Sequence, residues 1–238
     1  MGELGLLQRI VIWVLPVVLA ITVHEVAHGW VAKLFGDTSA EQAGRLTLNP
    51  IPHIDPVGTV LVPAMLLVSS ALLQTGMFVF GWARPVPVSW QRLRRPKQDM
   101  AYVAAAGPAA NLVMALLWGL FAHLMVRVLA GGTEVVVPLV LMGVAGIFIN
   151  AILMVLNMLP LLPLDGGRVV TSLLPVNMAV RFARLEPYGL VILLALLFTG
   201  MLQWILGPPL MWVLAALSAT TGLTGAQYMG LLQVLMGH

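Results

Sequence analysis

Long uncharged stretches separated by short polar segments dominate the sequence. Residues 57–80, 101–126 and 135–164 contain no Asp, Glu, Lys or Arg, and residues 11–34 contain only His24, Glu25, His28 and Lys33 as ionisable groups. A helix needs roughly 20 apolar residues to cross a hydrocarbon core about 30 Å thick. Each stretch is therefore long enough to cross a membrane, although Pro63 and Gly76 make residues 57–80 a less regular helix that either crosses or re-enters.

The C-terminal stretch, residues 187–238, also lacks charged residues. Gly207, Pro208 and Pro209 interrupt it, which predicts two spans joined by a tight turn. The whole pattern predicts an all-α fold, a polytopic transmembrane helical bundle of about five to six membrane segments with short β-like loops between them.

Composition supports a membrane protein and narrows its chemistry. Hydrophobic residues make up 60% of the chain and charged residues 9%, against about 45–50% and roughly 25% in soluble domains. The basic residues lie between apolar stretches, which is typical of topology signals and gives no indication of nucleic-acid binding. Because the chain has no cysteine, a metal site would need nitrogen and oxygen ligands.

The densest basic cluster marks the cytoplasmic side. It comprises Arg84, Arg92, Arg94, Arg95 and Lys97, and positive charge accumulates in cytoplasmic loops. The orientation of the first helix then depends on residues 57–80. A full crossing by that segment places the N-terminus inside, whereas a re-entrant segment places it outside.

The first apolar stretch carries an H-E-x-x-H motif. His24 and His28 are four residues apart, so they share one helix face and can bind a single cation, and Glu25 can reach a metal-activated water as general base. The short pattern also recurs by chance in soluble proteins. Inside an apolar span, however, a central charge costs about 2.5–3.5 kcal/mol on insertion scales, which favours a functional site over a structural polar cluster or an ion path.

A catalytic zinc usually has three protein ligands, so a third ligand is expected elsewhere. The main candidates are His53, Asp55, His123 and Asp165. Asp165 is the best of them because it follows an apolar stretch and precedes two glycines that allow a tight turn. It is equally well explained as the N-cap of a helix from Gly166 onward.

Three ordered motifs together resemble the site-2 protease family of zinc metalloproteases, which cleave substrates within or beside the membrane. They are His24-Glu25-Val26-Ala27-His28, Ala106-Gly107-Pro108-Ala109-Ala110-Asn111, and Asn157-Met158-Leu159-Pro160 leading into Leu164-Asp165-Gly166-Gly167. Further likeness at residues 49–58 and 80–87 indicates a compact prokaryotic subgroup without PDZ or CBS domains.

The resemblance implies a role for each motif residue. Asp165 becomes the third zinc ligand, and Glu25 becomes the general base that later protonates the leaving amine. Asn157 and Asn111 become candidate hydrogen-bond donors to the substrate backbone or the oxyanion, although hydrogen bonding between helices explains them equally well. The resemblance also implies that the first helix enters from outside, which requires residues 57–80 to re-enter.

The functional hypothesis is an intramembrane zinc endopeptidase that hydrolyses transmembrane proteins or peptides. It would form one membrane-embedded domain over residues 1–238, with a catalytic core at about residues 9–176 and additional spans at about 187–238, in a prokaryotic cytoplasmic membrane. Residues 49–58 and 80–88 could pair with an unwound substrate as an added strand. The alternative is a metal-ion transporter that uses the same cluster. The sequence indicates no oligomeric state.

Overall fold

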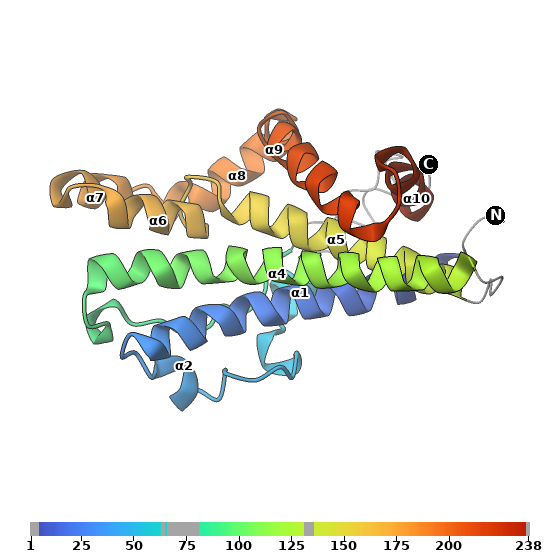
Figure 1. The fold of residues 1–238 in the computed structure, drawn as a ribbon. Coiled ribbons are helices and arrows are strands. Elements are labelled where there is room, and N and C mark those ends of the chain that lie inside the picture. Colours follow the sequence, from blue (N-terminus) through green and yellow to red (C-terminus); the bar gives the residue numbers. More distant parts are fainter. Residues whose placement is uncertain (1–4, 63–64, 66–80, 131–135, 237–238) are drawn as a thin grey trace.

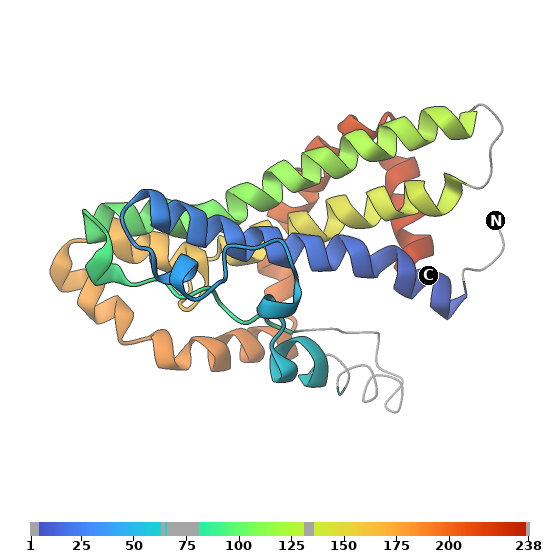
Figure 2. The ribbon, with the colours of Figure 1, turned by 90° about the horizontal axis from the view of Figure 1, so that it is seen from below.

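Three long helices form the centre of the molecule. The computed structural model describes residues 5–62, 65, 81–130 and 136–236. Helix α4 (Pro96–Ala130) packs against α1 (Leu6–Leu34) and α5 (Val137–Asn157), and α1 also contacts α5. Both ribbon views show the three helices side by side (Figures 1 and 2). At 1.5 Å per residue, α4 is about 50 Å long, so its ends extend beyond a hydrocarbon core of about 30 Å.

Shorter elements surround these helices. The described residues between α1 and α4 include α2 (Ser39–Gln42), the 3-10 turns Ile51–His53 and Trp90–Arg92, and a short π-helix at Pro56–Leu61. After α5 the chain forms α6 (Asp165–Leu173), α7 (Val176–Ala183), a turn at Glu186–Tyr188, and α8 (Gly189–Phe198). It ends with α9 (Met201–Ser218), a turn at Ala219–Thr221, and α10 (Gly225–Met236). Helices α6 and α7 lie beside the start of α4 (Figure 1).

The main hydrophobic core joins α4 and α5 to α9 and α10. Trp118 from α4, Ile147 from α5 and Tyr228 from α10 are among its buried side chains. This core therefore lies in the half of the molecule that contains the end of α4, away from the basic loop that precedes α4. The C-terminal helices pack against the bundle.

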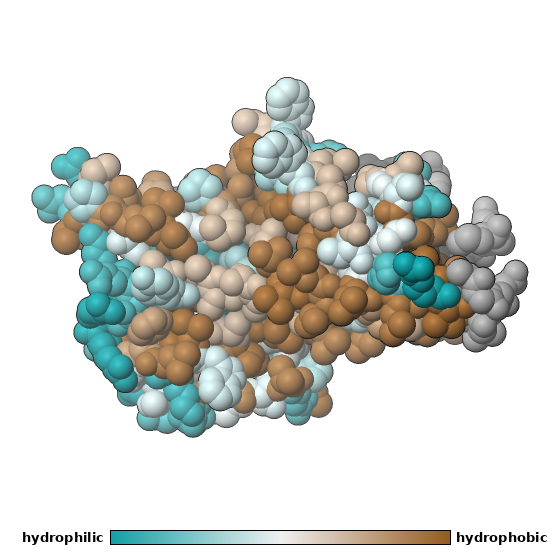
Figure 3. Space-filling model, in the orientation of Figure 1, coloured by the Kyte–Doolittle hydropathy of each residue, from teal (hydrophilic) through white to brown (hydrophobic). Residues whose placement is uncertain are grey.

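Apolar side chains also cover much of the outer surface of the long helices. On α4 alone the exposed ones include Leu112, Val113, Leu116, Leu117, Leu120 and Leu124. Figure 3 shows hydrophobic residues over the middle of the bundle and hydrophilic residues gathered at the end that carries the start of α4. Soluble monomers rarely expose such large apolar patches. This surface, together with the apolar helices, fits a protein embedded in a lipid bilayer.

Four of the described helices are long and apolar enough to cross a membrane. They cover Ile10–Leu34, Pro96–Leu129, Val137–Asn157 and Met201–Thr221. The all-α fold predicted from the sequence is confirmed, and the described residues contain no strand. The predicted number of five to six membrane segments is not confirmed.

The predicted tight turn at Gly207, Pro208 and Pro209 is wrong. All three residues lie inside α9. The breaks come instead at Gly200 and Gly222, whose φ angles of 75° and 72° place them in the left-handed region that glycine adopts readily. Residues 189–236 therefore form α8, α9 and α10 rather than two spans joined by one tight turn.

Most of residues 57–80 lies outside the described residues, but the flanks of this segment are close together. The Trp82 amide donates to the Gly58 carbonyl at 3.1 Å. Further out, the Arg94 amide donates to the carbonyl of Phe35, directly after α1, at 3.0 Å. The chain thus leaves α1 and enters α4 at the same end of the bundle.

Candidate metal centre

Helix α1 supplies two imidazoles that face the same point. His24 and His28 are one helical turn apart, and their Nε2 atoms are 3.0 Å apart. Their side chains are only 9% and 12% exposed. The spacing of the H-E-x-x-H motif therefore produces the paired nitrogen ligands that helix geometry predicts.

Asp165, the first residue of α6, completes a triangle with the two histidines. Its Oδ2 atom lies 3.2 Å from Nε2 of His24 and 3.3 Å from Nε2 of His28. These are the separations expected around a tetrahedral zinc, because ligand bonds of about 2.0–2.1 Å place neighbouring ligand atoms about 3.3 Å apart. Oδ2 is buried and has no hydrogen-bond partner, which fits an atom whose partner is a metal ion.

The N-cap explanation of Asp165 is wrong. Helix α6 begins at Asp165, its N-cap is Leu164, and no side chain caps it. The glycines that follow also have a different role from the one predicted, because neither has a positive φ angle. A Cβ atom on Gly166 would overlap the carbonyl oxygens of Met158 and Leu159. The glycines thus allow α6 to pack against the preceding turn, and this packing holds Asp165 toward α1.

A chain of buried amides fixes the ring of His24. Nδ1 of His24 donates to Oδ1 of Asn111 at 2.6 Å. Nδ2 of Asn111 donates to the carbonyl of Ala20 and to Oδ1 of Asn150. Nδ2 of Asn150 in turn donates to the carbonyl of Gly146. Because Nδ1 carries the proton, Nε2 presents its lone pair to the metal position.

His28 is oriented in the same way by the backbone. Its Nδ1 donates to the carbonyl of Val103 at 2.7 Å. A carbonyl oxygen can only accept, so Nδ1 holds the proton and Nε2 is again free to bind metal. Helix α4 therefore supplies the partners of both histidines.

Gly107 of α4 lies directly against the cluster. A Cβ atom at this position would come within 2.6 Å of Nε2 of His24 and would also overlap Nε2 of His28. Any side chain here would fill the space between the imidazoles and the α4 backbone. Glycine is therefore required for the metal site to remain open.

Glu25 is held by the extended segment that precedes α4. Its Oε2 atom accepts a hydrogen bond from the Val86 amide at 2.8 Å. This hydrogen bond fixes one oxygen of the carboxylate. Glu25 directly follows His24 in the sequence. This bond connects α1 with a residue 61 positions away.

The other candidates lie away from this cluster. His53 bonds the Thr47 carbonyl through Nε2, Asp55 accepts the amides of Val57 and Gly58, and His123 accepts from Arg127. Among the described residues, His24, His28 and Asp165 are the one group of three or more His, Cys, Asp or Glu whose ligand atoms converge. The cluster can bind one divalent cation.

Two curated proteins resemble this chain. The protein named "Putative zinc metalloprotease YwhC" from Bacillus subtilis is 37% identical over 202 residues, which cover 83% of this chain and 84% of that protein. The chain belongs to its family of zinc metalloproteases. The protein named "Putative zinc metalloprotease Rip2" from Mycolicibacterium smegmatis is 27% identical over 186 residues, 78% of this chain and 66% of that protein. No family model and no solved structure matches the chain.

For this zinc metalloprotease family member, the motifs contain the three residues that converge in the structure but do not show which residues orient them. Val86, Val103, Gly107 and Asn150 were not predicted as part of the site. Val86 and Val103 act through their backbones, and a backbone contact leaves no mark on residue type. The Gly107-Pro108 pair inside an apolar helix is the one available signal, since glycine in a helix commonly marks close packing.

Asn157 lies at the end of α5 and is partly exposed. Its Nδ2 donates to the carbonyl of Leu153 at 2.9 Å. None of the hydrogen bonds of Asn111 or Asn150, the two side-chain amides near His24, involves Asn157. The roles of Asn157 and Asn111 toward a substrate stay predictions.

The extended segment before α4 is poorly supplied with free donors for an added strand. The amides of Trp82, Arg84 and Val86 donate to Gly58, His53 and Glu25. Pro85 and Pro87, which occupy the alternating positions, have no N–H. Few backbone N–H groups on either edge of the segment are therefore free to bond a substrate strand, which weakens the hypothesis that such a strand pairs here.

Proposed function

We propose that this protein is an intramembrane zinc endopeptidase of the site-2 type. The observation that carries the proposal is the triangle that His24 and His28, on the candidate membrane span Ile10–Leu34, form with Asp165 at the start of α6. Glu25 lies in the same motif as the two histidines. Membership of a zinc metalloprotease family supports the peptidase activity. No observation in the described part of the chain favours a metal-ion transporter.

The two histidines and Asp165 would hold one Zn²⁺. Bound there, zinc supplies Lewis acidity, which polarises a carbonyl and lowers the pKa of water toward about 7. Glu25 then removes a proton from the attacking water and delivers it to the nitrogen of the leaving amine. The bond from the Val86 amide holds Oε2 and leaves the second carboxylate oxygen for this transfer.

We assign Asn111 a positioning role. Its oxygen accepts from His24, and its amide nitrogen donates to both Ala20 and Asn150. It thus has no free donor for a substrate. Asn157 uses its amide in one bond, to Leu153, so a second amide hydrogen can donate to the substrate backbone or an oxyanion.

Positive charge sets the orientation proposed for the membrane. The basic loop before α4 and the end of α1 lie together, and the exposed residues there include Arg92, Arg94, Arg95 and Lys97. We place this end in the cytoplasm of a prokaryotic cell and the N-terminus outside. The cluster then lies toward the cytoplasmic half of α1. The substrate would be a transmembrane protein or peptide.

The test measures whether the protein cuts a single-span membrane peptide, and at which position. Wild-type protein in detergent is expected to cleave within or directly beside the apolar segment, as mapped by mass spectrometry of the products. Glu25→Gln is expected to reduce the rate by about 10²- to 10⁴-fold, because general acid–base catalysis is worth that much. Cleavage confined to soluble regions, or undiminished cleavage by Glu25→Gln, would contradict the proposal.

A further inference from the structure

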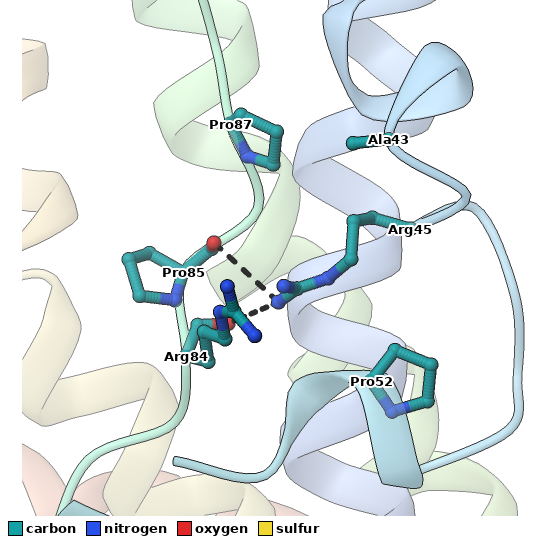
Figure 4. Close-up of a pocket in the computed structure, with 6 residues that line it drawn as sticks. All are labelled: Ala43, Arg45, Pro52, Arg84, Pro85 and Pro87. Atoms are coloured by element: carbon teal, nitrogen blue, oxygen red, sulfur yellow. Dashed lines mark hydrogen bonds between the residues drawn. The ribbon is translucent and has the colours of Figure 1, made fainter.

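A basic pocket lies beside the segment that holds Glu25. Its volume is ≈ 400 Å³. It opens between the chain that follows α2 and the extended segment before α4, and Figure 4 shows both walls. Its lining residues are Ala43, Arg45, Pro52, Arg84, Pro85 and Pro87.

Arg45 lines this pocket, and its guanidinium is incompletely paired. The residue is only 7% exposed. One terminal nitrogen donates to the carbonyl of Arg84 at 2.6 Å and, at 3.5 Å, to that of Pro85 (Figure 4). Its Nε atom is buried without a partner. Burying a guanidinium against neutral carbonyls alone is costly unless a negative charge compensates.

A second guanidinium lies next to the first. The Arg84 side chain is drawn beside that of Arg45 in Figure 4. Burial and then repulsion from Arg84 lower the pKa of Arg45, while the negative charge of Glu25 acts in the opposite direction. Two like charges at one pocket favour the binding of an anion.

No carboxylate of the described residues forms an ion pair with Arg45 or Arg84, although the charge of Glu25 acts on Arg45 without direct contact. The acidic side chains near this end of the bundle are engaged elsewhere, Asp37 with Ser39 and Ser89 and Glu41 with Lys33. Residues 57–80 contain no acid in their sequence.

The pocket is also close to the catalytic carboxylate. Val86 lies between the lining residues Pro85 and Pro87, and its amide donates to Glu25 at 2.8 Å. Arg45 in this pocket is also close enough to Glu25 for their charges to interact, so a peptide cleaved beside Glu25 lies near the pocket. A guanidinium offers a planar fork of donors that matches a carboxylate.

We propose that this pocket binds a carboxylate of the peptide substrate, from an Asp or Glu side chain or a free C-terminus, on the cytoplasmic side of the cleaved bond. The inference rests on the proposed function, because it concerns the substrate of the same site. Arg84 and Arg45 together would give the enzyme a preference for acidic substrates, and the zinc cluster would perform the hydrolysis.

The experiment measures binding separately from cleavage. Three labelled single-span peptides are compared on the Glu25→Gln protein in phosphatidylcholine nanodiscs by fluorescence anisotropy. One carries Glu in its cytoplasmic flank with an amidated end, one carries Gln with a free terminal carboxylate, and one carries Gln with an amidated end. At least one acidic peptide is expected to bind about 10-fold more tightly than the neutral one, as one well-formed ion pair allows. The two acidic peptides identify which carboxylate is recognised.

Two further variants separate the pocket from general electrostatics. Arg84→Gln is expected to bring the affinity for the acidic peptide down to that for the neutral one. Arg94→Gln removes the same charge from an exposed position on the same loop, outside the pocket, and is expected to keep the 10-fold ratio. Equal affinities for all three peptides, or an equal loss in Arg94→Gln, would overturn the proposal.

A lipid headgroup is the competing occupant. If phosphatidylglycerol in the nanodiscs abolishes the preference for acidic peptides, a phosphate occupies the pocket and the proposal fails. Wild-type cleavage of the neutral peptide is measured in parallel. Absence of that cleavage would count against the peptidase activity, whereas cleavage without any charge preference would count against the pocket alone.

Discussion

At the residue scale, the metal cluster combines two ligands from one helical turn of α1 with a third ligand and a hydrogen-bond partner that are distant in the sequence. The His24 and His28 pair follows from helix geometry, because residues four apart share a face. Asp165 could not be chosen over a helix cap by spacing alone, and the choice depended on family resemblance. The contact of His24 with Asn111 spans 87 positions, and no local pattern in the sequence encodes a contact at that separation.

Gly107 gives the sharpest residue-scale prediction. Gly107→Ala is expected to weaken zinc binding by about 10- to 100-fold, the range typical of damage next to metal ligands, because the added Cβ would overlap both imidazoles. Zinc affinity is measured by competition with a chelator of known affinity. Gly230→Ala in α10 is the control, since nothing lies within 4 Å of a Cβ there. Equal affinity in the two variants would show that Gly107 does not border the site.

At the scale of elements, the length of each uncharged stretch predicts the long helices well but predicts their ends poorly. Residues 101–126 correspond to the apolar part of α4. The proline pair at 208 and 209 was expected to end a helix, yet it lies inside α9. Neighbouring helices and local adjustments satisfy backbone groups freed by proline inside membranes, so proline is a weaker stop signal there than in water. The left-handed glycines ended the helices instead.

The connection between elements at the polar end depends on Asp37. This buried carboxyl accepts hydrogen bonds from Ser39 at the start of α2 and from the Ser89 amide before α4. Burial alone would raise the pKa of Asp37, but these hydrogen bonds outweigh it and lower the pKa below its ordinary value. A lowered folded-state pKa stabilises the protein above the unfolded-state pKa, near 3.9, and this stabilisation is lost as the pH falls through the folded-state pKa.

Asp37→Asn is therefore expected to lower Tm at pH 7 by on the order of 5 °C. The difference from wild type should begin to shrink as the pH falls below about 4, because Asp37 of the unfolded wild-type chain then takes up a proton. It should be smallest once the pH is below the lowered folded-state pKa of Asp37. Thermal unfolding in detergent across this pH range provides the measurement. Glu41→Gln, which removes an exposed carboxylate, is the control and should change Tm little at either pH. A Tm difference that is independent of pH would argue against a role for the charge.

At the scale of the whole molecule, the sequence left the orientation of the first helix open. The bond between Trp82 and Gly58 pairs the two flanks of residues 57–80, and the bond between Arg94 and Phe35 brings the end of α1 and the start of α4 to one end of the bundle. Pairing of these flanks is a tertiary contact that hydropathy does not reveal. The number of spans was likewise not predictable from apolar length, since α8 and α10 have only 10 and 12 residues.

The orientation can be tested by cysteine labelling, because the chain has no cysteine of its own. Gln8→Cys near the N-terminus is expected to react with a membrane-impermeant maleimide in intact cells. Lys97→Cys, at the start of α4, is expected to react only after permeabilisation. Both side chains are exposed, so access differs only by the side of the membrane. The reverse labelling pattern would contradict the orientation.

The most direct test of the central claim is the zinc content of purified wild type, Asp165→Ala and Glu25→Gln, measured by mass spectrometry of the metal alongside peptide cleavage. We expect one zinc per chain and cleavage in wild type, zinc with cleavage slowed by about 10²- to 10⁴-fold in Glu25→Gln, and strongly reduced zinc in Asp165→Ala. Full zinc in Asp165→Ala, or cleavage at the wild-type rate in Glu25→Gln, would contradict the proposed metal site and its general base.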